Sequence, residues 1–379
     1  MRPVRVAVVR QRYADDGGAE RFVARMLEAF RGRPIELALV TREWSDGGTV
    51  EFLKCNPFYL GRLWRDSSFA RGVCRLLRSR RFDLVQSHER IACCDIYRAG
   101  DGVHAEWLEQ RSRALGALAR LSLALNPYHR YLCRAERRLF QSPRLRAVIC
   151  NSHMVKDEIM RRFGLPAERL HVIYNGVDTR AFHPDLKRHR GTVRAQHGIA
   201  ADAPLFLFVG SGFERKGLAA ALAALAPVRD AHLLVVGRDK HAARFQRHAH
   251  RLGIAGRVHF VGKQPDVKPY YGAADALVLP TLYDPFPNVA LEAMAAGLPV
   301  ITSRKCGAAE IIKDNENGYV CDAIDVAALH AAMTKLIPGA PRAAMGAAAR
   351  RTVEALDFER MTTQLLTLYR ACSAHNDTR

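Results

Sequence analysis

Short apolar runs recur along the chain and alternate with longer stretches that have the spacing of helices. A run of about four to eight apolar residues is typical of a buried strand, and strands separated by helices predict doubly wound parallel sheets. The strands expected in the first half are Val4–Val9, Ile35–Val40, Asp83–Ser87, Ala147–Cys150 and His171–Tyr174. Those expected in the second half are Leu205–Val209, His232–Val236, Val258–Val261, Ala276–Leu279 and Val300–Thr302. The pattern predicts an α/β protein with two Rossmann-like domains.

Two changes in this pattern indicate the domain boundaries. The stretch between Phe182 and Pro204 is polar and basic, so we expect a linker there. A last helical stretch runs from Asp357 to about Cys372. We therefore expect a first domain of residues 1–182, a second domain of residues 183–356 and a C-terminal helical segment of residues 357–379.

Two carboxylates stand eight positions apart across the start of an expected helix. Asp284 lies in the loop before the helix, and Glu292 lies about one turn inside it. Backbone N–H groups from about Asn288 and Val289 onward are the donors of a helix N-terminus, which attract a phosphate. Carboxylates accept hydrogen bonds from sugar hydroxyls, so the segment could seat a nucleotide sugar. The alternative is an ordinary capped helix after a buried strand.

A second cluster follows the expected strand Leu205–Val209. The segment Gly210–Gly217 ends in Arg215-Lys216-Gly217, which places two cations at a strand-to-helix turn. Two cations there can neutralise a diphosphate leaving group. The alternative is a solvated pair of basic residues at a turn. After the first expected strand, Gly17 and Gly18 precede a helix and would let the backbone approach a ligand closely, or simply form a tight turn.

These segments resemble the retaining glycosyltransferases of family 4, which have the GT-B fold. Asp284 and Glu292 match that family's E-x7-E motif, with Asp284 in place of the usual Glu, and Gly210–Gly217 matches its G-x-G-x-x-R-K-G segment. The resemblance implies two Rossmann-like domains facing across a cleft, with the last helix crossing back to the first domain. It also implies a UDP-sugar donor and retention of the anomeric configuration.

The resemblance assigns roles to further residues. Gly17 and Gly18 would lie against the donor's phosphate and sugar, and Gly262 and Lys263 would contact the base. Asp101 falls at the position of an acceptor-side acid, and His104 falls beside the donor sugar, although such a pair taken alone is more often structural. The expected catalytic residues are Asp101, His104, Asp284 and Glu292.

No isolated D-x-D tripeptide stands beside a glycine loop, so we expect no metal and no cofactor other than the donor. The family retains configuration, and front-face attack is the favoured route, although the sequence does not distinguish it from double displacement.

The chain is strongly basic, with a formal net charge of +20, and nine arginines but one acid lie between Arg111 and Arg146. Arg130, Arg134, Arg137 and Arg138 recur at helical spacing after a leucine-rich stripe. Such a segment is typical of an interface with anionic lipid, or of a core-packed helix with a solvated basic face. The first reading agrees with the resemblance, which is strongest to the lipopolysaccharide core glucosyltransferase I group. That group adds glucose to the inner-core heptose at the inner face of the cytoplasmic membrane.

The apolar runs and the cysteines indicate the cellular location of the protein and the redox state of its thiols. No apolar run reaches the length of a membrane span, and the apolar run at the N-terminus is too short for a signal peptide, so we expect a cytoplasmic protein peripheral to the membrane. The nine cysteines form no C-x-x-C pair, and we expect them to be reduced and buried.

Other classes explain fewer of these features. A nucleic-acid-binding protein would also be basic, but no helix-turn-helix, zinc or RNP pattern is present, so we expect no nucleic-acid partner. A sugar-nucleotide epimerase of the same fold and a transferase for another surface polysaccharide or glycolipid remain alternatives.

Overall fold

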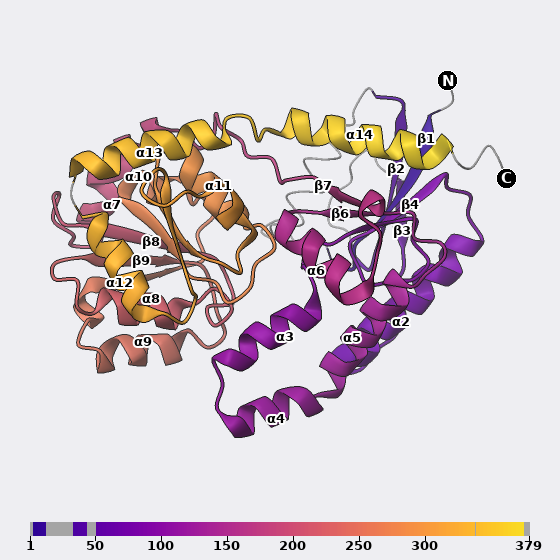
Figure 1. The fold of residues 1–379 in the computed structure, drawn as a ribbon, viewed down its shortest axis with the longest axis horizontal. Helices are drawn as coiled ribbons and strands as arrows, with labels where there is room; N and C mark the ends of the chain where they lie inside the picture. The colour runs from indigo at the N-terminus through magenta and orange to yellow at the C-terminus, as the bar shows by residue number, and fades with distance from the viewer. Residues whose placement is uncertain (1–2, 13–32, 44–50, 338, 375–379) are drawn as a thin grey trace. The chain divides into compact units, whose positions relative to one another are not determined.

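The computed structural model describes residues 3–12, 33–43, 51–337 and 339–374. The chain forms two compact units (Figure 1). Unit 1 comprises Met1–Asn175 together with Phe358–Arg379, and unit 2 comprises Gly176–Asp357. The division thus falls after Asn175, whereas the sequence pattern placed the boundary after Phe182.

Unit 1 is built on a sheet of seven strands whose pairings are all parallel among the described residues. The strands are β1 (Val4–Val9), β2 (Ile35–Thr41), β3 (Glu51–Lys54), β4 (Leu84–Ser87), β5 (Ile96–Arg98), β6 (Ala147–Cys150) and β7 (Leu170–Val172). Their order in the sheet is β3-β2-β1-β4-β5-β6-β7. Strands β3 and β5 were not predicted, because β3 is a largely exposed edge strand and β5 is only three residues long.

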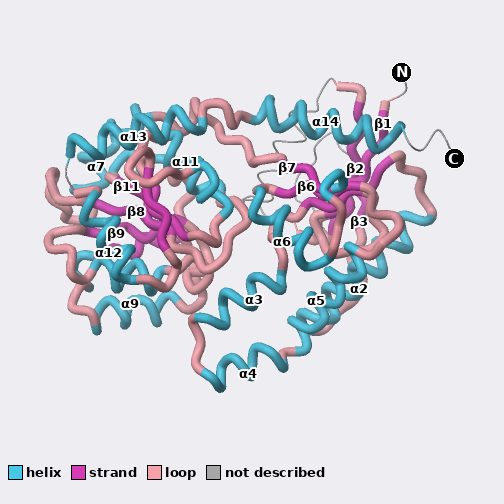
Figure 2. Tube along the Cα trace, viewed as in Figure 1, coloured by secondary structure: helices cyan, strands magenta, loops and turns pink. Residues whose placement is uncertain are grey.

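Helices cover both faces of this sheet (Figure 2). The helices of the described part of unit 1 are α2 (Gly61–Arg78), α3 (His104–Arg113), α4 (Ala117–Leu125), α5 (Pro127–Phe140), α6 (His153–Phe163) and α14 (Phe358–Ala374). Of these, α3 and α4 pack on α5. Alternate residues of β1 point to opposite faces, so Ala7 and Val9 join the core under α2, α5 and α6 while Val6 and Val8 face α14.

The last helix, α14, belongs to unit 1 although it follows unit 2 in the chain (Figure 1). Its residues Met361, Leu365 and Tyr369 are buried against strand residues of the sheet. The hydroxyl of Tyr369 donates to Gln86 Oε1 of β4 at 2.6 Å. The expected return of the C-terminal helix to the first domain is therefore present in the structure.

Unit 2 has a six-stranded sheet in the order β10-β9-β8-β11-β12-β13, again with parallel pairings. Its strands are β8 (Leu205–Val209), β9 (His232–Val236), β10 (Val258–Gly262), β11 (Ala276–Leu279), β12 (Val300–Ser303) and β13 (Gly318–Cys321). Its helices are α7 (Arg190–Gln196), α8 (Leu218–Leu225), α9 (Ala242–Arg251), α10 (Lys268–Ala273), α11 (Asn288–Ala295), α12 (Val326–Lys335) and α13 (Gly339–Val353). The expected strands of this half are all present, and β13 is an addition.

The predicted linker between Phe182 and Pro204 is wrong. A 3-10 helix (Pro184–His189) and α7 occupy this stretch, and both pack on α10. The packing is close, because a Cβ added at Gly272 of α10 would lie 1.9 Å from the carbonyl oxygen of Leu186. Arg194 is buried and its guanidinium pairs with Asp275 at 2.9 Å, so a basic residue that suggested a solvent-exposed linker is part of the core.

The expectation of reduced cysteines is wrong for one pair. Cys74 of α2 and Cys93, in the loop between β4 and β5, form a disulfide with their Cα atoms 5.8 Å apart. They are 19 residues apart in sequence, and only the packing of α2 over that loop brings them together. The other seven cysteines are free, and all of them except the half-buried Cys133 are buried.

The two sheets share one topological feature that locates candidate sites. In each sheet, the second and third strands lie on one side of the first strand, and the fourth and later strands lie on its other side. The order reverses between β1 and β4 in unit 1 and between β8 and β11 in unit 2. In open parallel sheets, ligands bind outside the carboxyl ends of the strands at such a reversal.

Candidate functional site

The loops that follow β8 and β11 are joined at the reversal point of unit 2. Arg215, in the loop after β8, accepts hydrogen bonds at its carbonyl oxygen from Leu282 N at 2.8 Å and from Thr281 Oγ1 at 2.9 Å. Gly217 has a φ of +78°, and a Cβ there would lie 1.9 Å from the carbonyl oxygen of Pro280. Only glycine therefore permits the backbone at position 217 to lie this close to Pro280. The close contact positions Arg215 and the neighbouring Lys216 beside the loop after β11.

Asp284 is the centre of this cluster. Its Oδ2 lies 2.7 Å from Lys216 Nζ and 3.3 Å from an Nη of Arg215, and both Asp284 and Lys216 are buried. Burial alone would raise the pKa of Asp284, but the nearby charges of Lys216 and Arg215 outweigh it and hold that pKa below its usual value. Asp284 is thus ionised, and the two cations it balances keep a net positive charge.

The backbone of Asp284 is held from a third loop. Its N–H donates to the carbonyl oxygen of Lys305 at 2.9 Å, and its carbonyl oxygen accepts from Gly307 N at 2.8 Å. The loop after β12 therefore fixes the backbone of Asp284. These backbone contacts of Lys305 and Gly307 were not predicted.

Glu292 occupies the second half of α11 and is buried. Its Oε2 accepts a hydrogen bond from the hydroxyl of Tyr271 at 2.8 Å. Asn288 and Val289 form the half-buried first turn of the same helix, which begins without a side-chain cap. The partner Tyr271 was missed, because it lies on α10, 21 residues before Glu292.

Gly262 closes β10 with a φ of +78°, and its carbonyl oxygen accepts from Gly237 N at 2.8 Å. Gly237 in turn approaches the loop after β8, since a Cβ there would lie 2.1 Å from the carbonyl oxygen of Gly210. The loop that carries Gly262 and the exposed Lys263 is therefore linked to the Arg215 loop through one intervening glycine. Asp239, which was not predicted as a site residue, lies in the same loop as Gly237. It adds a second link to the loop after β8 by accepting a hydrogen bond from Phe213 N at 2.8 Å.

Taken together, unit 2 brings Arg215, Lys216 and Asp284 into direct contact. It places Glu292 on the helix that follows the Asp284 loop. A surplus of positive charge beside a helix N-terminus suits a diphosphate, and carboxylates suit the hydroxyls of a sugar. This arrangement can bind a nucleotide sugar. Gly17 and Gly18 lie outside the described residues.

In unit 1, Asp101 and His104 lie in different surroundings. Asp101 has a side chain that is 59% exposed, and its Oδ2 lies 4.0 Å from an Nη of Arg90. His104 begins α3 and is buried, with its Nε2 3.0 Å from Nδ1 of His129. Burial, together with Arg90 and His129, lowers the pKa of His104 to about 3. Its imidazole is therefore neutral near pH 7 and can act there only as a neutral hydrogen-bonding group.

A buried carboxylate fixes the turn that carries these two residues. Glu136 Oε1 accepts from the backbone N–H of His104 at 2.6 Å and from Nε of Arg90 at 2.9 Å. Arg90 also donates to the carbonyl oxygen of Gly102 at 3.3 Å. Arg90 and Glu136 were not predicted as parts of the site, because they are 46 residues apart and no local motif connects them.

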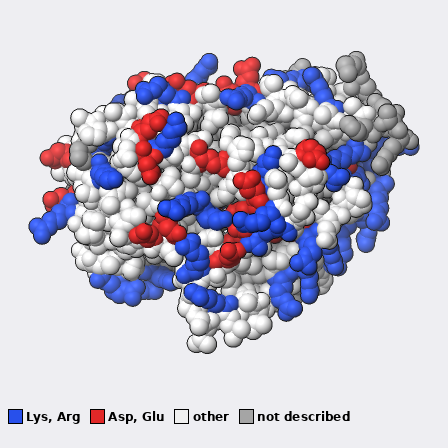
Figure 3. Space-filling view, viewed as in Figure 1, with Lys and Arg blue, Asp and Glu red and all other residues white. Residues whose placement is uncertain are grey.

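The predicted basic segment forms α4 and α5. Arg130, Arg134, Arg137 and Arg138 are all exposed on α5. On α4, Leu118, Leu121 and Leu125 are 86%, 58% and 62% exposed, while Leu123 is buried. Figure 3 shows basic side chains gathered along α2 and α5 and a mostly uncharged surface over α4. No helix of the described part of the chain is long and apolar enough to cross a membrane.

Comparisons with known proteins cover both units. Residues 16–181 match the family model described as Glycosyltransferase Family 4, and residues 189–352 match the model described as Glycosyl transferases group 1. The lipopolysaccharide glucosyltransferase WaaG of Escherichia coli (strain K12) is 28% identical over 323 residues, which are 83% of this chain and 84% of WaaG.

Two further likenesses extend over nearly the whole chain. The lipopolysaccharide core biosynthesis glycosyltransferase LpsE of Rhizobium meliloti (strain 1021) is 26% identical over 331 residues, 86% of this chain and 87% of LpsE. The crystal structure of WaaG matches with a TM-score of 0.82 and 26% identity, over 96% of this chain and 99% of that one. The predicted fold, with two Rossmann-like domains, is confirmed.

The pKa of His104 predicts a pH dependence of stability. Because that pKa falls from about 6.5 in the unfolded chain to about 3 in the folded one, the unfolded chain binds the proton first as the pH drops. The contribution is therefore fully present above pH 6.5 and is lost progressively below it, by about 2 kcal/mol between pH 7 and pH 5. We expect His104→Asn to lose less unfolding free energy than the wild type over this interval in urea titrations. His241→Asn, at an exposed histidine, should keep the wild-type pH dependence, and equal slopes for all three proteins would contradict the assignment.

Proposed function

We propose a reaction for this chain from one premise: the chain belongs to family 4 of the glycosyltransferases and has their GT-B fold. The proposed reaction is the metal-independent transfer of a hexose, with glucose as the first choice, from a UDP-sugar to a lipopolysaccharide core heptose with retention of configuration. The names of two relatives, a lipopolysaccharide glucosyltransferase and a lipopolysaccharide core biosynthesis glycosyltransferase, support the sugar and the class of acceptor.

The observation that carries the proposal is the contact between Asp284 and the two cations Arg215 and Lys216. In the proposed complex the cations bind the donor diphosphate, and their charge stabilises it as it leaves the sugar. The N-terminus of α11, at Asn288 and Val289, supplies backbone donors to the same phosphates. The cations can serve in this way because one carboxylate balances only part of their charge.

The carboxylates are proposed to hold the donor's hydroxyl groups. Asp284 would accept from the sugar close to the diphosphate, and Glu292 would accept from a donor hydroxyl while Tyr271 keeps its carboxylate oriented. Gly262 and Lys263 are proposed to contact the base, and Gly17 and Gly18 to lie along the phosphates.

Retention follows, in this proposal, from attack on the face that the diphosphate leaves. The acceptor hydroxyl would give its proton to the departing phosphate oxygen, so no separate base and no metal are needed on the donor side. Asp101 would accept a hydrogen bond from the acceptor. His104, which is neutral, would offer one imidazole nitrogen to the donor sugar rather than a positive charge.

The segment formed by α4 and α5 supports a proposed location at the inner face of the cytoplasmic membrane. Exposed leucines cost free energy in water and gain it in the apolar part of a bilayer. Arginines near an anionic surface contribute about 1 kcal/mol each. A segment with both, and without a spanning helix in the described part of the chain, suits reversible attachment to the surface.

Replacement of Glu292 tests the proposed site. Glu292→Gln keeps the size of the side chain and an oxygen that can accept from Tyr271, but it removes the charge that strengthens the hydrogen bond to a donor hydroxyl. We expect transfer from UDP-glucose to a core acceptor to fall at least about a hundredfold while the thermal midpoint stays near that of the wild type. Glu316→Gln, at an exposed acid of the same unit, is the matched control. Rates near the wild-type value in folded Glu292→Gln would remove Glu292 from the site, and loss of activity in EDTA would contradict metal independence.

A charge-matched pair of variants tests the membrane surface. Replacing Arg130, Arg134, Arg137 and Arg138 with Ser should weaken binding to vesicles containing anionic lipid, measured by co-sedimentation, and should spare transfer to a soluble acceptor. The control replaces Arg229, Arg244, Arg247 and Arg251, which are exposed on unit 2, and so makes the same change in net charge. Equal losses in the two variants would show that only net charge matters and would refute the α5 surface.

A further inference from the structure

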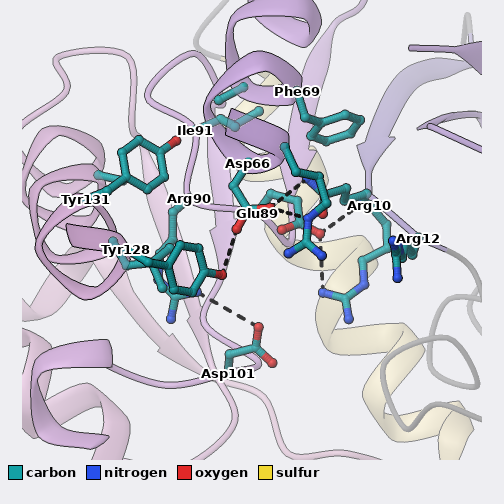
Figure 4. Close-up of a pocket in the computed structure, with 15 residues that line it drawn as sticks. Arg10, Arg12, Asp66, Phe69, Glu89, Arg90, Ile91, Asp101, Tyr128 and Tyr131 are labelled. Atoms are coloured by element: carbon teal, nitrogen blue, oxygen red, sulfur yellow. Dashed lines mark hydrogen bonds and ion pairs between the residues drawn. The ribbon is translucent and has the colours of Figure 1, made fainter. Parts of the chain in front are cut away.

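Unit 1 has a pocket at its own point of strand reversal (Figure 4). Its volume is about 310 Å³. Residues 10–12, directly after β1, and residues 89–91, shortly after β4, form one part of its lining, while side chains of α2 and α5 form another. Asp101 also lines it. The pocket thus occupies the position in its sheet that a ligand site takes in doubly wound folds.

The pocket is rigidly organised around one carboxylate. Asp66 of α2 accepts from Nε of Arg65 at 2.7 Å, from Nε2 of Gln11 at 3.2 Å and from the hydroxyl of Tyr128 at 2.8 Å. Figure 4 shows Tyr128 and Asp66 turned toward one another. These bonds tie α2, α5 and the segment after β1 together, so the lining groups are positioned before a ligand arrives.

A second carboxylate in the pocket is also balanced. Glu89 Oε1 accepts from the backbone N–H of Gln11 at 2.9 Å and lies 3.5 Å from an Nη of Arg10. Asp66 and Glu89 are thus each paired with a cation of the pocket itself. Neither supplies negative charge that would repel an anionic ligand.

Once the paired charges of the pocket are set aside, one guanidinium, that of Arg12, and one carboxylate, that of Asp101, remain. Four arginines line it, at positions 10, 12, 65 and 90, against three carboxylates, Asp66, Glu89 and Asp101. Arg90 is closer to Glu136, at 2.9 Å, than to Asp101, at 4.0 Å. Arg12 is exposed and makes no ion pair with any residue that the structure describes. Within the described ranges, the pocket therefore offers a guanidinium without an ion-pair partner together with an accessible carboxylate.

We propose that this pocket binds an anionic sugar, with its acid group at Arg12 and one of its hydroxyls at Asp101. Guanidinium groups bind phosphate and carboxylate groups through paired N–H donors, and a carboxylate accepts from a hydroxyl. Phe69, Ile91 and Leu132 supply apolar surface for the ring, and the volume suits about one sugar unit with its substituent. The inference rests on the proposed function, in which this sugar is the acceptor. It adds that the acceptor unit is recognised by its negative charge.

Calorimetry on the full chain with three soluble probes tests the proposal without any transfer reaction. The probes are methyl glucoside phosphate, methyl glucuronide and neutral methyl glucoside. We expect at least one anionic probe to bind about tenfold more tightly than the neutral one, since a charge-assisted contact is worth roughly that factor. Tighter binding of the phosphate would assign a phosphorylated sugar, and tighter binding of the glucuronide would assign a sugar acid.

Arg12→Gln should remove most of the preference for the anionic probe. Arg71→Gln, which removes an exposed arginine of α2 that does not line the pocket, should retain it. Equal affinity for charged and neutral probes, no binding of any probe, or equal losses in the two variants would overturn the proposal. Stabilisation of the same preparation by UDP, measured as a thermal shift, reports on the donor site of unit 2. A failure of this pocket is thereby distinguished from a failure of the proposed function.

Discussion

The candidate donor site depends on one buried charge, the carboxylate of Asp284. A buried carboxylate is costly unless cations and hydrogen-bond donors surround it, and removing one partner of such a pair typically costs about 3–5 kcal/mol. Lys216 and Arg215 compensate it from the loop after β8, and Gly307 holds its backbone from the loop after β12. Three loops are therefore required to adopt one arrangement together. The cations of the site are preorganised by the same contact, so they do not have to be ordered when a diphosphate binds.

Unit 1 is also organised around a buried carboxylate, that of Glu136. Glu136 is buried and accepts hydrogen bonds from Arg90 and from the backbone of His104, which fixes the turn after β5. The exposed Asp101 is therefore presented from a rigid turn, although its own side chain has few contacts. In both units a buried acid sets the geometry while more exposed charges remain for a ligand. The strand order explains why the unit 2 arrangement forms at the carboxyl ends of β8 and β11, whereas in unit 1 Arg90 follows β4 and His104 follows β5.

The parts of the fold that could be predicted are those whose signal is local. The buried strands Val4–Val9, Leu205–Val209 and Ala276–Leu279 match residue for residue, because strands covered on both faces read as continuous apolar runs. Edge strand β3 exposes three of its four residues and gives no such run. The stretch around Arg194 was misread because a long-range partner, Asp275, allows an arginine to be buried. Likewise, motif spacing placed Arg215, Lys216 and Asp284, whereas Tyr271 and Glu136 act through contacts that only the folded chain creates.

The surface of α4 has an energetic consequence for where the chain can act. Three leucines stay largely exposed while only Leu123 is buried, and full burial of a leucine side chain is worth about 1.5–3 kcal/mol. The arginines of α5 are also exposed, and their attraction to an anionic surface decreases as salt screens it. Binding through leucine burial and arginine attraction together would be strong on an anionic bilayer and weak on a neutral one. It would also be reversible, because the two contributions bind a membrane less strongly than a spanning helix does. The proposed function, with its lipid-linked acceptor, would gain from this balance, since attachment concentrates the enzyme at the surface that holds the acceptor and still allows release.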